Sequence, residues 1–192
     1  RTFGEGTLLP NTYHYSRGHD RNAILQQMER LMTETLDTLW IERDPNSPLK
    51  TPSEAIILAS IIEKETSLAD ERARVSGVFI NRLRLGMPLQ SDPTVIFGIT
   101  MGQRSLGRSI SKADLRKATA YNTYVINGLP PAPITNPGSA SILAALHPKN
   151  SKDLYFVANG EGGHAFSSSF EEHKKNVNNW RKFRAKKLKR ID

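Results

Sequence analysis

The stretch AIILASII, residues 55–62, constrains the fold more than any other feature of the chain, since it is apolar on nearly every side of a helix. Thr51, Pro52 and Glu54 precede it. A threonine N-cap, a proline in the first turn and a glutamate three residues after the threonine are the usual start of a helix with a capping box. A helix that is apolar all round must be covered by its neighbours. We therefore expect a buried central helix.

Hydrophobic periodicity predicts further helices on both sides of this segment. Apolar residues recur at three- and four-residue steps from Asp20 to Leu39, and again from about Asp70, with Gly86 placed to end that helix. A short helix is expected over residues 139–146 and a last one from about Ser169. These helices would pack their apolar faces around the central one.

Strand signals come mainly from the second half of the chain. We expect short strands at residues 94–97 and 121–126, and a β-hairpin that runs from residues 154–158 through a glycine-rich turn to residues 165–166. Residues 13–15 form one more possible strand. Helices are predicted mainly in the first half of the chain and strands mainly in the second half. This order favours an α+β fold, here a helix-rich domain with a small mixed or antiparallel sheet.

The composition limits the class of protein. With 192 residues and 38% hydrophobic content, the chain can bury the core of one medium domain. The absence of cysteine excludes disulfides and thiolate metal sites. The formal charge is +8, and much of the excess lies in residues 181–190. That basic helix is either a solvated face or a surface for an acidic polymer, an anionic lipid or nucleic acid.

The ends of the chain suggest how it is organised. No apolar run reaches the roughly 20 residues that a membrane-spanning helix needs. The chain begins with arginine rather than methionine, so we expect a fragment from which an upstream anchor or domain has been removed. Residues 1–19 are interpreted as the remnant of a preceding region, and residues 20–192 as the main domain, which ends in the basic helix.

The end of the central helix carries the best candidate for acid–base chemistry. Desolvation penalises the charged form of a carboxyl group, so a partly buried glutamate can rise from a pKa near 4.3 to about 6 or 7. Glu63 falls on the helix face of Ile56 and Ala59, whereas Glu65 points about 200° away. We therefore expect Glu63 to face a pocket. The alternative is that both glutamates are surface charges that pair with Lys64 or with nearby arginines.

Polar residues that suit a sugar ligand gather in three loop segments, 90–92, 121–124 and 162–164. An aromatic ring stacks on a pyranose face, and amides bind hydroxyl groups. Each segment also has a purely structural explanation, as a turn or as a partner for backbone groups. The five histidines show no paired ligand spacing, and the zinc-protease, phosphate-loop and Gly-x-Ser-x-Gly motifs do not occur. We therefore expect no metal and no cofactor.

Six strings then carry a family resemblance. The chain resembles the MltG (YceG-like) endolytic murein transglycosylases in EGTLLP (5–10), ASIIEKET (59–66), VFINRL (78–83), LQSDPTVIFG (89–98), AYNTYVINGLPPAPITNPG (120–138) and LYFVANGEGGHAF (154–166). The likeness runs in the same order from Glu5 to about Trp180. It implies a lyase that cleaves the β-1,4 bond between N-acetylmuramic acid and N-acetylglucosamine inside nascent glycan strands and leaves a 1,6-anhydro end.

The resemblance also implies roles for particular residues. It places the catalytic acid and base on Glu63, with the muramyl C6 hydroxyl as the nucleophile. Residues that line or brace the glycan groove would be Asn81, Gln90, Ser91, Asp92, Tyr121, Asn122, Thr123, Tyr124 and His164.

The family further implies a setting for the domain. It would face the periplasm or the cell surface, held to the cytoplasmic membrane by an N-terminal helix that this chain lacks. Peptidoglycan strands and cell-wall synthases would be its partners, and nucleic acid would not. Two other functions stay open at this point. One is a noncatalytic module that binds the cell wall, and the other is a pyridoxal-phosphate lyase that uses Lys64.

Overall fold

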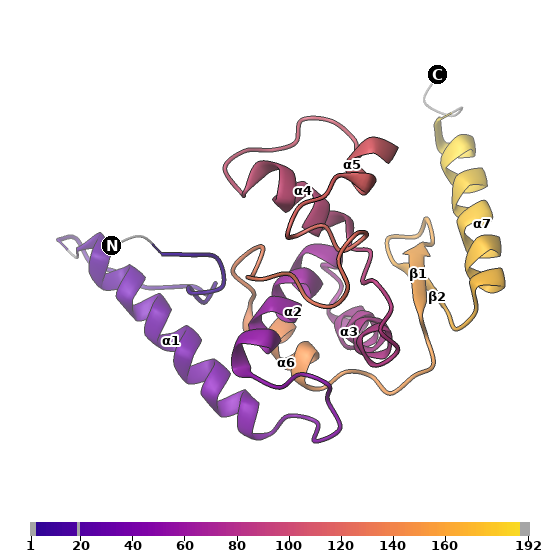
Figure 1. Cartoon of the computed structure of the whole chain (residues 1–192). Coiled ribbons are helices and arrows are strands. Elements are labelled where there is room, and N and C mark those ends of the chain that lie inside the picture. Colours follow the sequence, from indigo (N-terminus) through magenta and orange to yellow (C-terminus); the bar gives the residue numbers. More distant parts are fainter. Residues whose placement is uncertain (1–2, 19, 189–192) are drawn as a thin grey trace.

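The central helix is present and buried as expected. The computed structural model describes residues 3–18 and 20–188. In it, α2 (Pro52–Glu65) contacts α1 (Arg21–Ile41), α3 (Ala69–Arg84), α4 (Asp92–Thr100) and α6 (Ser139–Leu146) (Figure 1). All eight side chains of residues 55–62 are buried. The α2 helix is therefore the one around which α1, α3, α4 and α6 pack.

The start of α2 follows the sequence signal in part. The Oγ1 atom of Thr51 accepts a hydrogen bond from the backbone N–H of Glu54 at 3.2 Å, and Pro52 is the first helical residue. The carboxylate of Glu54 accepts from the backbone N–H of Lys50 instead of that of Thr51. Thr51 is thus the N-cap, but the reciprocal half of the capping box is replaced by a contact one residue earlier.

The α3 helix lies against the turn that follows α6. Lys149 donates its backbone N–H to the carbonyl of Ala73 at 2.8 Å, and a Cβ on Gly77 would lie 2.5 Å from the carbonyl oxygen of Lys149. Glycine is therefore required at residue 77 for this close approach. Gly86, with a φ of +65°, follows the end of α3, as the sequence predicts.

The strand predictions before residue 150 are wrong. Residues 94–97 belong to α4, which begins at Asp92 with a proline in its first turn. Residues 121–126 form consecutive turns, in which Asn122 accepts hydrogen bonds from the backbone of Val125 and Ile126. The short α5 (Lys112–Arg116) was not anticipated, and residues 13–15 form no strand.

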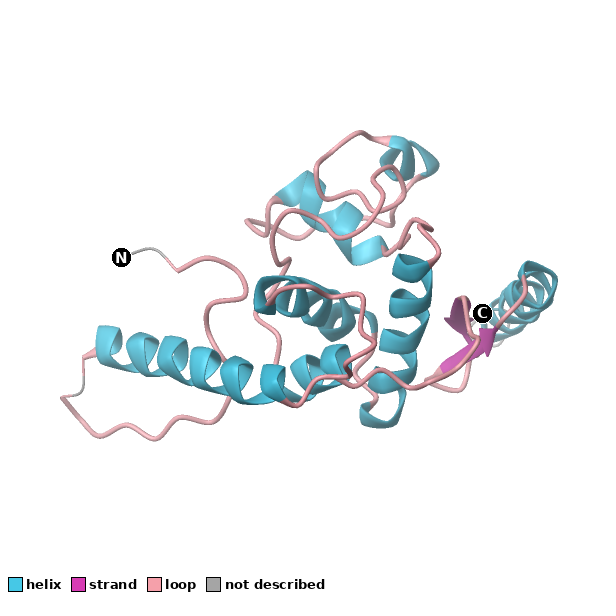
Figure 2. Cartoon of the chain, turned by 60° about the horizontal axis from the view of Figure 1, so that its bottom comes forward, coloured by secondary structure: helices cyan, strands magenta, loops and turns pink. Residues whose placement is uncertain are grey.

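The hairpin and the last helix form the second part of the molecule. Strand β1 (Tyr155–Ala158) pairs antiparallel with β2 (His164–Ser167), with Phe156 opposite Phe166. Helix α7 (Phe170–Leu188) packs on both strands, to one side of the other helices (Figure 2). We call β1, β2 and α7 the hairpin unit, and α1 to α6 the helical body. The α+β prediction is confirmed, with a two-stranded antiparallel sheet.

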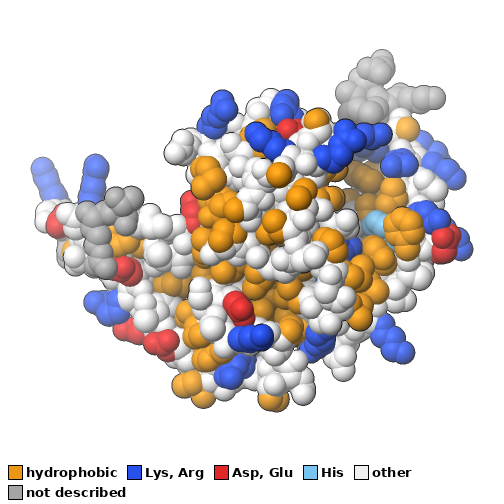
Figure 3. Space-filling model, viewed as in Figure 1, with side chains coloured by type: hydrophobic (Ala, Val, Ile, Leu, Met, Phe, Trp, Pro, Cys, Tyr) orange, Lys and Arg blue, Asp and Glu red, His pale blue; other side chains and the backbone are white. Residues whose placement is uncertain are grey.

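The molecular surface also distinguishes the hairpin unit from the helical body. Figure 3 shows Lys and Arg side chains gathered over α7 and a hollow between α7 and the helical body. The predicted basic helix is present through Leu188, and residues 189–190 of the basic stretch lie outside the described residues. None of the helices within the described residues is long and apolar enough to cross a membrane.

Candidate active site

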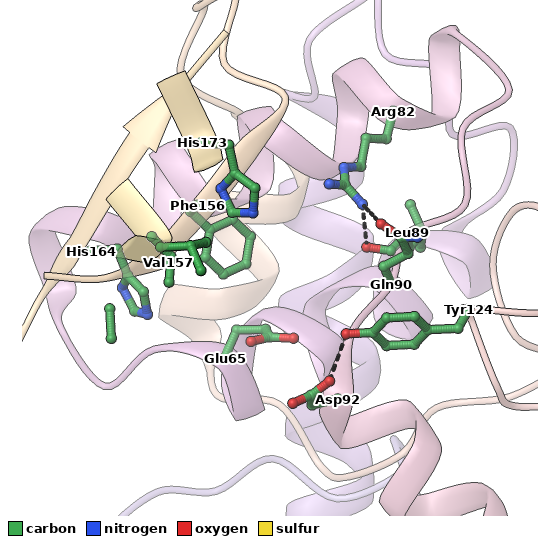
Figure 4. Close-up of a pocket in the computed structure, with 12 residues that line it drawn as sticks. Glu65, Arg82, Leu89, Gln90, Asp92, Tyr124, Phe156, Val157, His164 and His173 are labelled. Carbon is green, nitrogen blue, oxygen red and sulfur yellow. Dashed lines mark hydrogen bonds between the residues drawn. The ribbon is translucent and has the colours of Figure 1, made fainter. Parts of the chain in front are cut away.

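A pocket of about 360 Å³ lies where the helical body meets the hairpin unit (Figure 4). Both parts of the molecule contribute side chains to it. The helical body provides Glu65, Arg82, Leu89, Gln90, Asp92 and Tyr124. The hairpin unit provides Phe156, Val157, Ala158, His164, His173 and Val177.

Glu65 is a protonatable carboxyl group in this pocket. It is the last residue of α2, and its Oε1 accepts a hydrogen bond from the hydroxyl of Ser91 at 2.5 Å. Burial raises the pKa of Glu65, the hydrogen bond from Ser91 opposes that rise, and the charge of Asp92 adds to it, so that the pKa reaches about 7 instead of 4.5. The negative end of a helix dipole also disfavours a carboxylate. Glu65 can therefore hold a proton at neutral pH and release it.

Glu63 lies on the opposite side of α2, away from this pocket. Its Oε2 accepts a hydrogen bond from the backbone N–H of Gly138 at 3.1 Å and one from the hydroxyl of Ser141 at 2.6 Å. Gly138 is the N-cap of α6, so this carboxylate satisfies the donors of a helix N-terminus. The catalytic role of Glu63 stays a prediction, but the expectation that Glu63 and not Glu65 faces the pocket is wrong.

The reason for this error is the packing of α2. The hydroxyl of Ser60, one turn before Glu63, accepts a hydrogen bond from the backbone N–H of Ile134 at 3.0 Å. The face of α2 that carries Ser60 and Glu63 is therefore covered by residues 134–141. The two glutamates do point apart, as helical geometry requires, but the sequence does not show which face is left open.

Four of the predicted groove residues line the pocket: Gln90, Asp92, Tyr124 and His164. The hydroxyl of Tyr124 donates to Oδ1 of Asp92 at 2.7 Å. Burial, followed by this hydrogen bond and the charge of Asp92, raises the pKa of Tyr124 above its usual range. Tyr124 therefore stays protonated and acts as a donor in the pocket.

Two more of the predicted residues brace the loop that carries Gln90. The backbone N–H of Ser91 donates to Oγ1 of Thr123 at 2.9 Å, and the N–H of Gln90 donates to the Thr123 carbonyl at 3.0 Å. The hydroxyl of Thr94 lies 2.8 Å from that of Thr123. Gln90 has a φ of +54°, which is uncommon for a residue with a side chain. These bonds hold the loop in that conformation and aim Ser91 at Glu65.

The remaining three predicted residues lie outside the pocket. The amide of Asn81 donates to the carbonyls of Ser151 and Asp153, at 2.8 and 3.0 Å. Asn122 is buried, and its amide donates to three carbonyls in residues 114–117. Tyr121 packs edge-on against Phe97. These side chains stabilise the loops around the pocket.

Among the residues around the pocket that were not predicted from the sequence are Arg82, His173 and Glu71. Arg82 donates from Nε to the Leu154 carbonyl at 2.7 Å and so ties α3 to the start of the hairpin. Its spacing of four residues from Val78 placed it on the buried face of α3, and that was the available signal. His173 comes from α7, and no sequence pattern predicts that α7 reaches the pocket.

Glu71 holds His164 in place from the first turn of α3. Its Oε2 lies 2.6 Å from the Nδ1 atom of His164, and its Oε1 accepts from the backbone N–H of the same residue at 2.8 Å. Burial works against ionisation, but the hydrogen bonds and charge of His164 hold the pKa of Glu71 below its usual 4.5. This contact joins the hairpin unit to the helical body.

Within the described residues, no three or more His, Asp or Glu side chains are placed to hold one metal ion. Lys64 is exposed and does not line the pocket.

Comparison with known proteins gives the class to which this fold and pocket belong. The model of the YceG-like family matches residues 1–179, and the chain belongs to that family. The sequence is 34% identical over 174 residues to the endolytic murein transglycosylase of Bacillus subtilis strain 168, which covers 89% of this chain and 46% of the relative. It is 32% identical over 179 residues to the protein of the same name from Streptococcus pneumoniae D39, which covers 90% and 31%.

A solved structure supports the fold. A YceG-like protein of Listeria monocytogenes is 35% identical and has a TM-score of 0.73, over 88% of this chain and 54% of that one. The chain thus spans about half the length of that protein, and less than half of the curated relatives.

Proposed function

We propose that this chain is the catalytic part of an endolytic lytic transglycosylase of peptidoglycan, with Glu65 as its acid and base. The observation that carries the proposal is the position of Glu65, a carboxyl group that ends the buried helix, lines the pocket beside Asp92 and has its pKa raised by burial to about 7. Its relatives are named endolytic murein transglycosylases, which supports peptidoglycan as the substrate. This assignment replaces Glu63 with Glu65 on the strength of their positions.

The chemistry needs one carboxyl group and a tethered nucleophile. Glu65 donates its proton to the glycosidic oxygen as the bond from the muramyl C1 to that oxygen breaks, which releases the N-acetylglucosamine C4 hydroxyl. The muramyl C6 oxygen then bonds to C1, and Glu65 takes the proton of that hydroxyl. The product carries a 1,6-anhydro ring, and Glu65 is protonated again. No water is consumed, because the nucleophile belongs to the substrate.

The other pocket residues suit this reaction. Asp92 places negative potential near the sugar whose C1 becomes positive in the oxocarbenium-like transition state. Tyr124 is a donor for a sugar hydroxyl or acetamido oxygen, and Phe156 offers an apolar surface elsewhere in the pocket lining.

The cellular setting extends this proposal. The domain works at the outer face of the cytoplasmic membrane, on strands that cell-wall synthases deliver, and an N-terminal anchor outside this chain holds it there. The basic residues of α7 suit an acidic polymer or membrane surface nearby.

Paired substitutions test the catalytic assignment. Glu65→Gln keeps the shape of the side chain but cannot supply a proton, so we expect glycan cleavage to fall at least about 100-fold. Glu63→Gln should keep most of the activity and lose stability of about 1 kcal/mol, because it weakens the cap of α6. Mass spectrometry of digested, uncrosslinked peptidoglycan measures both the rate and the anhydro ends.

The outcomes separate the alternatives. Unchanged cleavage by Glu65→Gln, together with loss of cleavage by a folded Glu63→Gln protein, would return the role to Glu63. Reducing ends in place of anhydro ends would indicate hydrolysis. Glycan binding by the wild-type protein without any cleavage would favour a noncatalytic wall-binding module.

A further inference from the structure

Arg82 is a buried cation at the end of the pocket away from Glu65. Only 7% of the surface of Arg82 is exposed to solvent. Its Nε and Nη1 atoms donate only to neutral oxygens, which are the carbonyls of Leu154, Pro88 and Leu89 and the side-chain oxygen of Gln90. Its Nη2 atom donates to no residue that the structure describes, and no described carboxylate lies within ion-pair distance of it. The guanidinium carbon lies 5.2 Å from the centroid of the Tyr155 ring, so its face contacts an aromatic ring, and one donor edge is left for a ligand.

Arg82 lacks an anionic partner among the described residues. Burial lowers the pKa of Arg82 from its usual value, since a desolvated charge is unfavourable. Buried charges in proteins are normally paired, and a charge-assisted hydrogen bond to a carboxylate is among the strongest pairings. A ligand carboxylate at this end of the pocket would provide that partner.

His173 lies beside Arg82, and it too has a polar atom without a hydrogen-bond partner among the described residues. Its ring stacks on Tyr155 with centroids 5.0 Å apart, and its Nδ1 atom is buried with no hydrogen-bond partner among the described residues. Burial and then the charge of Arg82 lower the pKa of His173. Figure 4 shows both side chains at one end of the pocket, with Glu65 and Asp92 at the other. The pocket is thus acidic at one end and cationic at the other.

We infer that Arg82 and His173 form a subsite for a carboxylate carried by the muramyl residue that Glu65 cleaves. The inference rests on the proposed function and adds the feature of the glycan that sets the site of cleavage. Muramyl and glucosaminyl residues alternate in the strand and are joined by the same β-1,4 linkage. They differ in the acidic lactyl substituent at C3, which is either free or extended by a peptide that has carboxylates of its own.

The subsite therefore sets the register of the strand. A muramyl residue next to Glu65 brings its carboxylate toward Arg82, whereas a glucosaminyl residue in the same place leaves the cation unpaired. An unpaired buried charge discriminates more strongly than a missing apolar contact, because the lost interaction is charge-assisted. The linkages that would place a glucosaminyl residue next to Glu65, which are half of those in the strand, are rejected in this way.

Binding measurements on the Glu65→Gln protein test this subsite without cleavage. Three tetrasaccharides are compared by calorimetry: a peptide-bearing muramyl glycan, the same glycan with its peptides removed and its lactyl carboxylates free, and chitotetraose, which has no carboxylate. We expect the acidic glycans to bind at least about tenfold more tightly than chitotetraose. The tighter of the two identifies the lactyl group or the peptide as the source of the carboxylate.

A second substitution connects this preference to Arg82. Adding Arg82→Gln should remove the preference, which is the ratio of the affinities for acidic glycan and chitotetraose measured within one protein, whatever the change in absolute affinity. Arg84→Gln, on the exposed side of the same helix, is the matched control and should keep the preference. Equal affinity for all three glycans, or a preference that survives Arg82→Gln, would overturn the inference. Failure of every glycan to bind would instead count against the proposed function.

A spectroscopic measurement covers the case in which Arg82→Gln does not fold. An anion next to Arg82 offsets its charge, so binding of an acidic glycan should raise the pKa of His173, and chitotetraose should raise it less. The ¹⁵N signals of the imidazole, assigned by their loss in His173→Phe, report this pKa with Arg82 intact. A pKa of His173 that responds equally to both ligands would contradict a carboxylate subsite.

Discussion

At the scale of single residues, Glu63 and Glu65 show how two like side chains on one helix acquire different roles. Glu63 binds the N-terminus of α6, where the backbone N–H of Gly138 and the hydroxyl of Ser141 donate to it. Glu65 ends α2 in a pocket with a second carboxylate, where its charge is disfavoured. The sequence showed that one of them was sheltered at the end of an apolar helix. It could not show which, because residues 134–141, far along the chain, cover one face.

The pKa of Glu65 predicts how activity depends on pH. Cleavage requires its protonated form, so the rate should fall as the pH rises through about 7. The hydrogen bond from Ser91 stabilises the carboxylate, and Ser91→Ala should therefore move this fall to higher pH. A pH–rate profile measures the shift, and Ser109→Ala, at an exposed position, is the control. A shift to lower pH would show that Ser91 has another role.

The same group predicts a change in stability. Its pKa in the folded protein lies above the unfolded value of 4.5, so its contribution to stability is full below pH 4.5 and is lost as the pH rises through about 7. Relative to Glu65→Gln, the wild-type protein should lose up to about 3 kcal/mol of unfolding free energy between pH 4.5 and pH 8. Urea unfolding at both pH values measures the difference. Parallel pH dependence of the two proteins would show that Glu65 is solvated.

At the scale of elements, local signals predicted the helices well and failed where packing decides. The N-cap of α2 and the extent of α6 follow from short-range patterns. Residues 94–97 carry β-branched and aromatic side chains typical of a strand, but they lie in α4, which packs on α2 and α5. Pro93 in the first turn was the local signal for a helix. The turns at 121–126 depend on hydrogen bonds made by Asn122, which no periodicity reveals.

The contact between α3 and Lys149 gives a prediction at this scale. Gly77→Ala improves helix propensity by about 1 kcal/mol, but its Cβ would meet the backbone oxygen of Lys149 at 2.5 Å. A backbone neighbour cannot move as a flexible side chain can, so we expect a net loss of about 1–3 kcal/mol. Thermal unfolding measures it. Gly4→Ala, where a Cβ would meet nothing within 4 Å, should be nearly neutral.

At the scale of the whole molecule, the pocket exists because the hairpin unit meets the helical body. Polar segments of the sequence predicted several residues of the pocket, among them Gln90, Tyr124 and His164. Periodicity placed Arg82 on the buried face of α3 but not in a pocket, and His173 is not recognisable until α7 and the hairpin are placed against α3. Pairwise contacts between segments some 90 residues apart cannot be read from a local pattern.

The hydrogen bonds between Glu71 and His164 should control how firmly the hairpin unit is held against the helical body. Glu71→Gln removes the charge and weakens both hydrogen bonds to His164. We expect faster hydrogen exchange in residues 155–167, unchanged exchange in residues 55–62, and a loss of cleavage. Exchange measured by mass spectrometry tests this, with Glu172→Gln on the exposed side of α7 as the control. Uniform exchange changes across the chain would point to global destabilisation instead.

The position of Glu65 between the two parts of the molecule has a kinetic consequence. A glycan that fills the pocket displaces water from around this carboxyl group and so raises its pKa above the value in the free protein. The loaded enzyme then keeps its proton at a pH at which the empty one has begun to lose it. The pH at which kcat falls on the alkaline side should therefore be higher than the pH at which kcat/KM falls, because the bound substrate excludes water from Glu65.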